Sequence, residues 1–482
     1  MNSAVSPLPF PQTHATEADI GRVFERQRET ALRLRRSTAA ERIAKIRRLH
    51  DAVMAARPEF YEAAYKDFRK PPAEVDLAEI LPVISEAKHA MRKLKKWMKP
   101  QGVWPTSLTL GLKSWVQHEP RGRCLIVSPW NYNVNLCFGP LVSAIAAGNT
   151  AILKPSEMTP HLTTVMARII KELFTEDEVA LFEGDATVSQ ILLALPFDHI
   201  FFTGSPAIGK IVMAAAAKHL TSVTLELGGK SPTIIDETAD IELAAKTLMW
   251  GKYTNCGQTC IAPDYLYVHP KIKDAFVAEC RKVLKESYGE SVQEQLESPN
   301  LARIVNLRHT QRVAGLLADA RQKGAKVVIG GEVRERDCFV QPTFLEDVPA
   351  NARIESEEIF GPLLPIRTYT DLDQVIADIN AQPKPLALYI WSRNERNIER
   401  MLSGTSAGGT CINHCVVQYG HGNLPFGGVN NSGIGQAHGL YGFKAFSHER
   451  AVVRTRIMFA KTFFPPYTAF KSKLMDFMLK TQ

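Results

Sequence analysis

The sequence lacks the segments that direct a chain into a membrane or out of the cell. None of its apolar runs is long enough to cross a bilayer, and Met1 to Thr16 has neither the basic start nor the apolar core of a signal peptide. It contains no internal repeat and no low-complexity tract, and only 8 of its 482 residues are Cys. We therefore expect a globular protein of the reducing cytoplasm, without an integral membrane segment.

A concentrated basic surface, which a nucleic-acid-binding protein needs, is also missing. The net charge is +8, but Lys and Arg are spread along the chain and balanced locally by Asp and Glu. The one Arg-rich stretch, residues 22–48, has apolar residues at helical spacing and a capping box formed by Thr38 and Glu41. This pattern predicts a helix with a solvated basic face, so we expect no nucleic-acid partner.

Predicted strands and helices alternate through most of the chain, which indicates an α/β fold. A length of 482 residues implies two or three domains. Three helical stretches are expected before Lys99, and residues 100–119 interrupt the helical pattern and are expected to form extended arms. Two series of short apolar strands then alternate with helices, one before Gly229 and one after it. Such alternation predicts parallel sheets that helices cover on both faces.

The strands of the first series are predicted at 124–128, 150–154, 179–182, 198–202 and 222–226, and its helices include 136–147, 187–194 and 206–219. Thr159 is expected to cap a further helix that begins at Pro160. The strands of the second series are predicted at 233–236, 265–268, 326–329, 363–369, 386–391 and 407–412. The chain after about residue 425 is too short for a domain and is expected to cross back to the first domain or to a partner.

Cys260 and Glu226 carry the strongest chemical signal. Cys260 ends the run Asn255-Cys256-Gly257-Gln258-Thr259-Cys260, and Glu226 opens the run Glu226-Leu227-Gly228-Gly229-Lys230 upstream of it. A thiol is the most nucleophilic side chain near neutral pH, and a carboxylate nearby can act as a base on a proton or a water molecule. The pair indicates covalent catalysis by a thiol.

Three further runs follow predicted strands, where open parallel sheets bind their ligands. Residues 201–209 open a helix whose N–H groups suit a pyrophosphate, although they do not form the GxGxxG fingerprint. Lys154 and Glu157 are able to hydrogen-bond ribose hydroxyls, and the charge of Glu157 would repel a 2′-phosphate. The Asn131 amide is able to donate to a developing oxyanion. Each run, taken alone, also fits an ordinary turn.

In this order the runs resemble the NAD(P)-dependent aldehyde dehydrogenase superfamily, over roughly residues 20–450. The segments 355–365 (Glu-Ser-Glu-Glu-Ile-Phe-Gly-Pro-Leu-Leu-Pro) and 424–435 (Leu-Pro-Phe-Gly-Gly-Val-Asn-Asn-Ser-Gly-Ile-Gly) complete the set. Within the superfamily the chain is similar to the class 3 group and, more closely, to bacterial coniferyl-aldehyde-dehydrogenase-like enzymes. The runs 255–265 and 447–450 carry that closer similarity.

The resemblance implies an aldehyde dehydrogenase fold with a Rossmann-like cofactor domain, an α/β catalytic domain and a small β bridging element. Cys260 would attack the aldehyde to form a thiohemiacetal and then a thioester. The Asn131 amide and the Cys260 N–H would hold the oxyanion, and Glu226 would activate the water that releases the acid. NAD is the implied cofactor, with NADP left open, and the implied cofactor-binding residues are Lys154, Ser156, Glu157, Gly204, Ser205, Gly209, Leu227, Glu358, Phe360 and Trp130.

The resemblance also implies domain limits and partners. Residues 20–99 and 121–229 would bind the cofactor, residues 230–425 would form the catalytic domain, and residues 466–482 would form a C-terminal tail. Residues 100–120 and 440–465 would form the bridging element of a homodimer. The implied substrate is a hydrophobic aldehyde, either aromatic and of coniferyl type or of medium to long chain.

Several alternatives stay open. A CoA-acylating semialdehyde dehydrogenase is one, although it would not need Glu226 as a water-activating base. A thiol esterase without redox chemistry is another. Cys256 is expected to be a small buried side chain, and the alternative is a reversible disulfide with Cys260. No metal is expected, because the gaps between Cys256 and Cys260 and between Cys411 and Cys415 are wider than in a CxxC knuckle.

The end of the chain, residues 463–479, is aromatic and basic. We expect it to pack over the body of the protein or over a partner subunit. The alternatives are a lid at the substrate entrance and a contact with a membrane surface. Asn133, Asn430 and Asn431 depart from the pattern of the superfamily and are expected to affect the shape of the pocket more than the mechanism.

Overall fold

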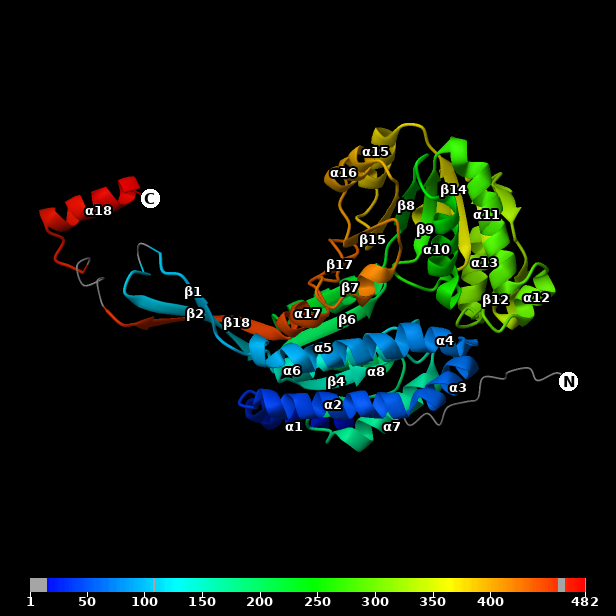
Figure 1. Cartoon of the computed structure of the whole chain (residues 1–482). Helices are drawn as coiled ribbons and strands as arrows, with labels where there is room; N and C mark the ends of the chain where they lie inside the picture. Colours follow the sequence, from blue (N-terminus) through cyan, green and yellow to red (C-terminus); the bar gives the residue numbers. More distant parts are fainter. Residues whose placement is uncertain (1–14, 107–108, 458–463, 482) are drawn as a thin grey trace.

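The protein has two large sheets with helices packed on them and one small sheet that extends away from both. The computed structural model describes residues 15–106, 109–457 and 464–481. Figure 1 shows the two large sheet-and-helix bodies lying next to each other, with the small sheet forming an arm. The predicted α/β class is therefore confirmed.

The first sheet has the strand order β17–β7–β6–β3–β4–β5. Its parallel strands are those of the first predicted series: β3 (Arg123–Val127), β4 (Thr150–Lys154), β5 (Val179–Leu181), β6 (His199–Gly204) and β7 (Ser222–Leu227). The chain fills the sheet from β3 to β5 in one direction and then returns to place β6 and β7 on the other side of β3. Ligands bind outside the carboxyl ends of strands at such a reversal, here between β3 and β6.

Helices α6 (Asn133–Ala147), α7 (Pro160–Leu173), α8 (Ala186–Leu193) and α9 (Pro206–Ala217) connect these strands. Helix α6 is buried along almost its whole length because it packs against the sheet on one side and α5 on the other. The predicted start of α7 is confirmed, with Thr159 at the N-cap position and Pro160 first, but the Thr159 side chain makes no capping hydrogen bond. The Thr159 hydroxyl instead accepts a hydrogen bond from the Asn133 amide at 3.0 Å, so the unusual Asn133 ties α6 to the start of α7.

The N-terminal region has four helical stretches, and the prediction of three was wrong. They are α1 (Glu17–Leu34), α2 (Ala39–Ala55), α3 (Arg57–Phe68) and a continuous run of α4 (Pro72–Val75), the π-helix η1 (Asp76–Ile80) and α5 (Leu81–Trp97). Arg69 separates the last two stretches with a left-handed backbone at φ 54°. The predicted Thr38–Glu41 capping box is confirmed. Part of the basic face is structural, because buried Arg42 donates to the Ala146 carbonyl near the end of α6.

The second sheet has the order β10–β13–β14–β9–β8–β15–β16, and all its pairs are parallel except β10 with β13. The strands are β8 (Ser231–Ile235), β9 (Pro263–Val268), β10 (Lys326–Ile329), β13 (Thr343–Glu346), β14 (Leu363–Thr368), β15 (Ala387–Trp391) and β16 (Gly409–Ile412). The second series of strands was predicted correctly except for β13, which the sequence analysis missed. The helices of this body are α10 (Ile241–Tyr253), α11 (Pro270–Tyr288), α12 (Val292–Glu297), α13 (Leu307–Gln322), α14 (Arg353–Ser356), α15 (Leu372–Ala381) and α16 (Glu395–Gly404).

The chain after residue 425 crosses back to the first sheet, as predicted. Strand β17 (Gly433–Ile434) pairs antiparallel with β7, so that Gly433 lies opposite Glu226, and α17 (Gly439–Ala445) then packs on α6 and α5. The arm is the sheet of β1 (Gln101–Val103), β2 (Leu112–Pro120) and β18 (Ser447–Thr455), followed by α18 (Ala469–Thr481). The predicted extended arms are thus present. No helix in the described ranges is long and apolar enough to span a membrane.

Candidate active site

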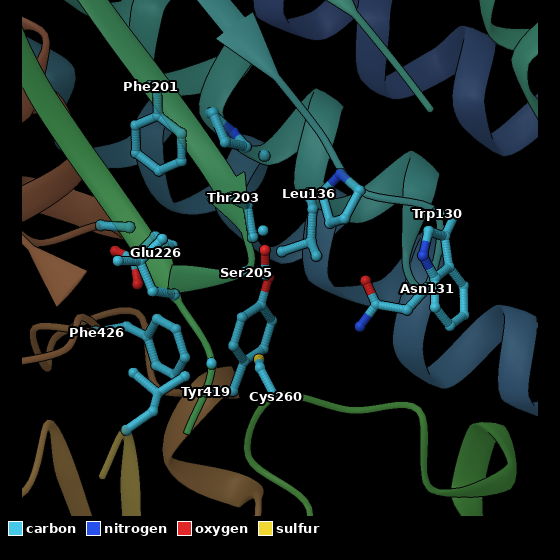
Figure 2. A pocket seen from close by; sticks show the side chains of 18 of the residues that line it. Trp130, Asn131, Leu136, Phe201, Thr203, Ser205, Glu226, Cys260, Tyr419 and Phe426 are labelled. Atoms are coloured by element: carbon cyan, nitrogen blue, oxygen red, sulfur yellow. The ribbon is translucent and has the colours of Figure 1, made fainter. Parts of the chain in front are cut away.

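A cavity of about 300 Å³ lies at the carboxyl ends of β3, β6 and β7, where the strand order reverses. Residues from both large bodies line it, and Figure 2 shows Cys260 with Glu226 to one side and Asn131 to the other. The cavity gathers nine of the predicted site residues: Trp130, Asn131, Gly204, Ser205, Glu226, Leu227, Cys260, Glu358 and Phe360. The chain fold therefore joins motifs that lie far apart in the sequence.

A second cavity of about 560 Å³ meets the first at Cys260. One face of η1 and α5 forms one wall of this second cavity, and the segment 416–423 forms part of another. The residues that line both cavities are Cys260, Glu86, Leu136, Tyr419 and His438. Cys260 therefore lies at the junction of the two cavities.

The loop that carries Cys260 has a fixed and unusual backbone. Asn255 and Cys256 both adopt left-handed conformations at φ 55°, and Gly257 follows at φ 75°. A Cβ on Gly257 would lie 2.3 Å from the Gly361 carbonyl oxygen, so only glycine fits there. The fully buried Gln258 amide donates to the carbonyls of Asn255 and Arg303, at 2.9 and 3.0 Å. These contacts hold the loop in one shape.

Asn131 lies against this loop from the opposite body. Its Nδ2 donates to the Gln258 carbonyl at 3.0 Å, and its own carbonyl accepts from the Asn255 Nδ2 at 3.0 Å. A second donor to the Asn131 carbonyl is the Lys70 ammonium, at 2.9 Å. The amide of Asn131 is therefore held next to the segment that ends at Cys260.

Glu226 is a buried carboxyl group without any hydrogen-bond partner in the described part of the chain. It is 5% exposed, and both of its carboxyl oxygens are unpaired. Burial raises the pKa of Glu226 well above its ordinary value. Burial also raises the pKa of the Cys260 thiol to about 12, and the nearby carboxyls of Glu358 and Glu226 add to this effect. This surrounding favours the protonated thiol, so the reaction of Cys260 requires that the proton leave.

Glu358 lies on a loop that a buried ion pair holds in place. The Lys230 ammonium pairs with Asp264 and donates to the carbonyls of Ile354 and Glu357, at 2.8 and 3.1 Å. The second oxygen of Asp264 accepts from the Ile359 N–H at 2.9 Å. Burial and the charge of Asp264 raise the pKa of Glu358 to about 8.

Four predicted residues, Lys154, Ser156, Glu157 and Gly209, do not line the cavity. Lys154 ends β4, where its ammonium donates to the Pro155 carbonyl at 2.8 Å and lies 3.8 Å from the Glu157 carboxylate. Gly209 lies under Leu227, and a Cβ there would come within 2.7 Å of the Leu227 side chain. Gly209 thus allows α9 to approach β7 closely, which is a packing role.

The sequence profile of the "Aldehyde dehydrogenase family" matches residues 11–452, which is most of the chain. Among curated relatives, the 4,4'-diaponeurosporen-aldehyde dehydrogenase of Staphylococcus aureus is 42% identical over 423 residues, or 88% of this chain and 91% of the relative. The chain belongs to the aldehyde dehydrogenase family. It is also 41% identical over 409 residues to aldehyde dehydrogenase family 3 member A2 of Mus musculus, which covers 85% of this chain and 83% of the relative. The predicted resemblance to class 3 is therefore confirmed.

Two solved structures illustrate the similarity in fold. The substrate-bound AldH of Staphylococcus aureus superposes with a TM-score of 0.90 at 40% identity, over 95% of this chain and 99% of the other. PnpE of a Pseudomonas species, solved in complex with nicotinamide adenine dinucleotide, has a TM-score of 0.82 at 25% identity, over 92% and 91% of the chains.

Several residues that line the cavity of this aldehyde dehydrogenase were not among the predicted site residues. Thr203 precedes the predicted Gly204, and its buried hydroxyl has no hydrogen-bond partner in the described ranges. His309 packs edge-on against Trp130, and Arg312 donates to the Glu358 carbonyl at 3.1 Å. Tyr419 also lines the cavity, and the sequence around it contains no recognisable motif. Thr203 belongs to the predicted run 201–209, whereas no motif marks His309 or Arg312, which only the folded chain brings to the site.

Cys256 belongs to a different environment from Cys260. It is buried in an apolar cluster with Ala302, Ile304 and Val313 and lines neither cavity. The thiols of Cys411 and Cys415 donate to the Gln418 side chain and to the Thr247 carbonyl. Within the described residues no group of three or more Cys, His, Asp or Glu side chains is arranged to hold a metal ion.

Proposed function

We propose that this chain oxidises a hydrophobic aldehyde to its carboxylic acid with NAD, through a covalent intermediate on Cys260. One observation carries the proposal. A single thiol at the junction of two cavities faces a buried, unpaired carboxyl group, Glu226, and a tethered amide, Asn131. Oxidation of an aldehyde through a thioester uses a nucleophile, a donor to the oxyanion and a base for hydrolysis, and these three groups can supply them.

In the first half of the reaction the Cys260 thiol loses its proton to water, and the sulfur bonds to the aldehyde carbon. The carbonyl oxygen then carries negative charge, and the Asn131 amide and the Cys260 N–H donate to it. Loss of hydride from the same carbon oxidises the adduct to a thioester. NAD supplies the acceptor for this hydride when it is bound.

In the second half Glu226 acts as general base. It takes a proton from water, the water oxygen bonds to the acyl carbon, and the carbon–sulfur bond breaks to release the carboxylic acid. Burial suits Glu226 to this role, because a raised pKa makes its carboxylate a stronger base near neutral pH. A CoA-acylating enzyme would not need this base, so the buried carboxyl favours hydrolysis.

The side of the cavity next to β6 and β7 fits a dinucleotide. A Cβ on Gly228 would lie 2.3 Å from the Glu358 carboxylate, and one on Gly204 would lie 2.5 Å from the Phe202 ring, so glycine lets both side chains approach the backbone here. The hydroxyl of Thr203 is an unpaired donor there. We assign the nicotinamide ribose to Glu358, the nicotinamide surroundings to Phe360 and Trp130, and the pyrophosphate to Gly204 and Ser205.

The adenosine end is assigned to the carboxyl end of β4. Lys154 and Glu157 would bind the ribose hydroxyls, with Ser156 between them in the sequence, while Gly209 would serve by letting α9 pack closely on Leu227. The half-exposed Glu157 carboxylate would repel a 2′-phosphate, so NAD is preferred to NADP.

The second cavity supports a long or aromatic apolar substrate. Its apolar side chains include Leu77, Leu81, Trp250 and Val417, which are exposed in the free protein. Residues that line this cavity follow one another along η1 and α5 from Leu77 to Arg92. At the usual helical rise this gives the cavity wall a length of about 22 Å. The relative from Staphylococcus aureus is named for 4,4'-diaponeurosporen-aldehyde. A coniferyl-type aldehyde is the aromatic member of the same proposed class.

We also propose the assembly and domain limits implied by the sequence. The arm formed by β1, β2 and β18 would join two copies as the bridging element of a homodimer, and the limits near residues 229 and 425 would divide cofactor binding from catalysis. All 8 Cys residues are free thiols, which agrees with a reducing cytoplasm.

An assay of NADH formation over a panel of aldehydes tests the proposal. We expect the highest kcat/KM for long-chain or aromatic aldehydes and no NADH from Cys260→Ala. A thiol esterase would hydrolyse an ester without NAD and form no NADH from any aldehyde. A CoA-acylating enzyme would form NADH only when CoA is added.

A further inference from the structure

A buried ion pair lies beneath the Asn131 segment. Lys70 and Glu79 are both fully buried, and the Lys70 Nζ is 2.7 Å from the Glu79 Oε1. Neither residue lines either of the cavities at Cys260. A buried pair of this kind contributes little net stability, because removing two charges from water costs about as much as their attraction returns. Its contacts point to another role.

Lys70 supports Asn131 directly. Its ammonium donates to the Asn131 carbonyl at 2.9 Å as well as to Glu79. The same ammonium lies 4.4 Å from the centre of the Tyr132 ring and 4.9 Å from that of Phe68. Lys70 therefore fixes the backbone of the residue that carries the amide and the ring of the residue that follows it.

Glu79 holds the other end of the same segment. Its second carboxylate oxygen accepts from the backbone N–H groups of Val134 and Asn135, both at 3.1 Å, in the first turn of α6. A carboxylate is favourable there because the helix N-terminus carries partial positive charge. Glu79 belongs to the π-helix η1, whose wider turn is a feature often found near functional sites.

We propose that Lys70 and Glu79 are positioning residues that set the location of the Asn131 amide. The pair fixes the segment 131–135 at both ends, and the Asn131 Nδ2 is then directed at the Gln258 carbonyl, two residues before Cys260. This inference rests on the proposed role of Asn131 as an oxyanion donor. A small displacement of that donor would weaken its contact with the developing charge.

A double-mutant cycle between Lys70 and Asn131 tests this proposal. Lys70→Met keeps the length of the side chain and removes its donor. We expect it to lower kcat about 10- to 100-fold, the order of loss that misplacement of a reacting group causes. The KM for the aldehyde should change less than about threefold, because Lys70 does not reach the cavity. In an Asn131→Ala background the same substitution should change kcat less than about threefold, since no amide remains to be positioned.

A second variant separates positioning from the cost of a buried, unpaired charge. Lys70→Met leaves the Glu79 carboxylate alone in the interior, and Lys70→Met with Glu79→Gln removes both charges. We expect the double variant to recover thermal stability and to keep the loss in kcat. A control is Lys45→Met, which breaks a partly exposed 2.7 Å ion pair with Glu178 that lines neither cavity at Cys260, and it should leave kcat unchanged.

The possible outcomes separate the two claims. If Asn131→Ala keeps full kcat, the proposed oxyanion role fails. If Asn131→Ala loses kcat while Lys70→Met has no effect, or lowers kcat by the same factor in both backgrounds, the positioning role is overturned. Failure of both Lys70 variants to fold would also overturn it, because the pair would then serve the fold alone.

Discussion

Replacing Glu226 with Gln should stop the enzyme after its first turnover. The substitution keeps the shape of the side chain and breaks no hydrogen bond in the described ranges, because neither carboxyl oxygen has a partner there. A positioned general base contributes about 10²- to 10⁴-fold to a rate, which is about 3–5 kcal/mol of activation free energy. We therefore expect kcat to fall by that factor while thioester formation on Cys260 continues.

The fold should tolerate this change. Burial raises the pKa of Glu226 above its ordinary value of 4.5, so the folded state holds this proton more tightly than the unfolded state. The contribution of Glu226 to the free energy of unfolding therefore falls as pH rises above about 4.5. It reaches its lowest value once the carboxyl group ionises in the folded state. At neutral pH the free energy of unfolding of Glu226→Gln should equal or exceed that of the parent.

Rapid-mixing kinetics with excess aldehyde give the assay. The parent should form NADH at a steady rate, and Glu226→Gln should give a burst of about one NADH per active site followed by a slow phase. The kcat of the parent should rise with pH as Glu226 ionises, and this rise should be absent from the variant. A variant that turns over at the rate of the parent, or that forms no burst, would refute the assignment of Glu226 to deacylation.

Three further predictions concern the cavities and the second thiol. Leu81→Glu should lower kcat/KM for a long-chain aldehyde roughly fivefold, because about 1 kcal/mol of apolar contact is lost. The kcat/KM for acetaldehyde should not change. Equal losses for both aldehydes would show that the alkyl chain of the substrate does not contact Leu81. Glu157→Ser should lower the KM for NADP and raise that for NAD, measured with one aldehyde, and unchanged values would remove Glu157 from the ribose site. Cys256→Ser should lose activity with peroxide and recover it with dithiothreitol as the parent does, because Cys256 packs away from the cavities; a difference would support a protective disulfide.

The strands and the motif residues were accessible from the sequence because their signals are local. Short apolar runs predicted β3, β4 and β6, and their ends then placed Asn131, Lys154 and Gly204 at one edge of a parallel sheet. The loops between strands were not predictable in this way. Tyr419 reaches Cys260 only through the folded chain.

The residues that support the site could not be predicted from the sequence either, since they depend on contacts between distant segments. Lys70 and Glu79 resemble ordinary surface charges in the sequence, but in the fold Lys70 follows the left-handed Arg69, Glu79 lies in the π-helix η1, and the two side chains are fully buried together. The Thr159 side chain was expected to cap α7, because a Thr directly before a Pro is common at helix starts. Its hydroxyl instead accepts a hydrogen bond from Asn133, which is distant in the sequence. The contacts of side chains whose partners are distant in the sequence therefore cannot be predicted from local sequence patterns.

Mass spectrometry of Glu226→Gln after mixing with aldehyde and NAD tests the central claim most directly. Peptide mapping should find the acyl group of the substrate on Cys260, as a thioester, and on none of the other 7 Cys residues of the chain. Treatment with hydroxylamine should remove it. An unmodified Cys260 in a variant that has released one NADH per site, or an acyl group on Cys256, would contradict the account.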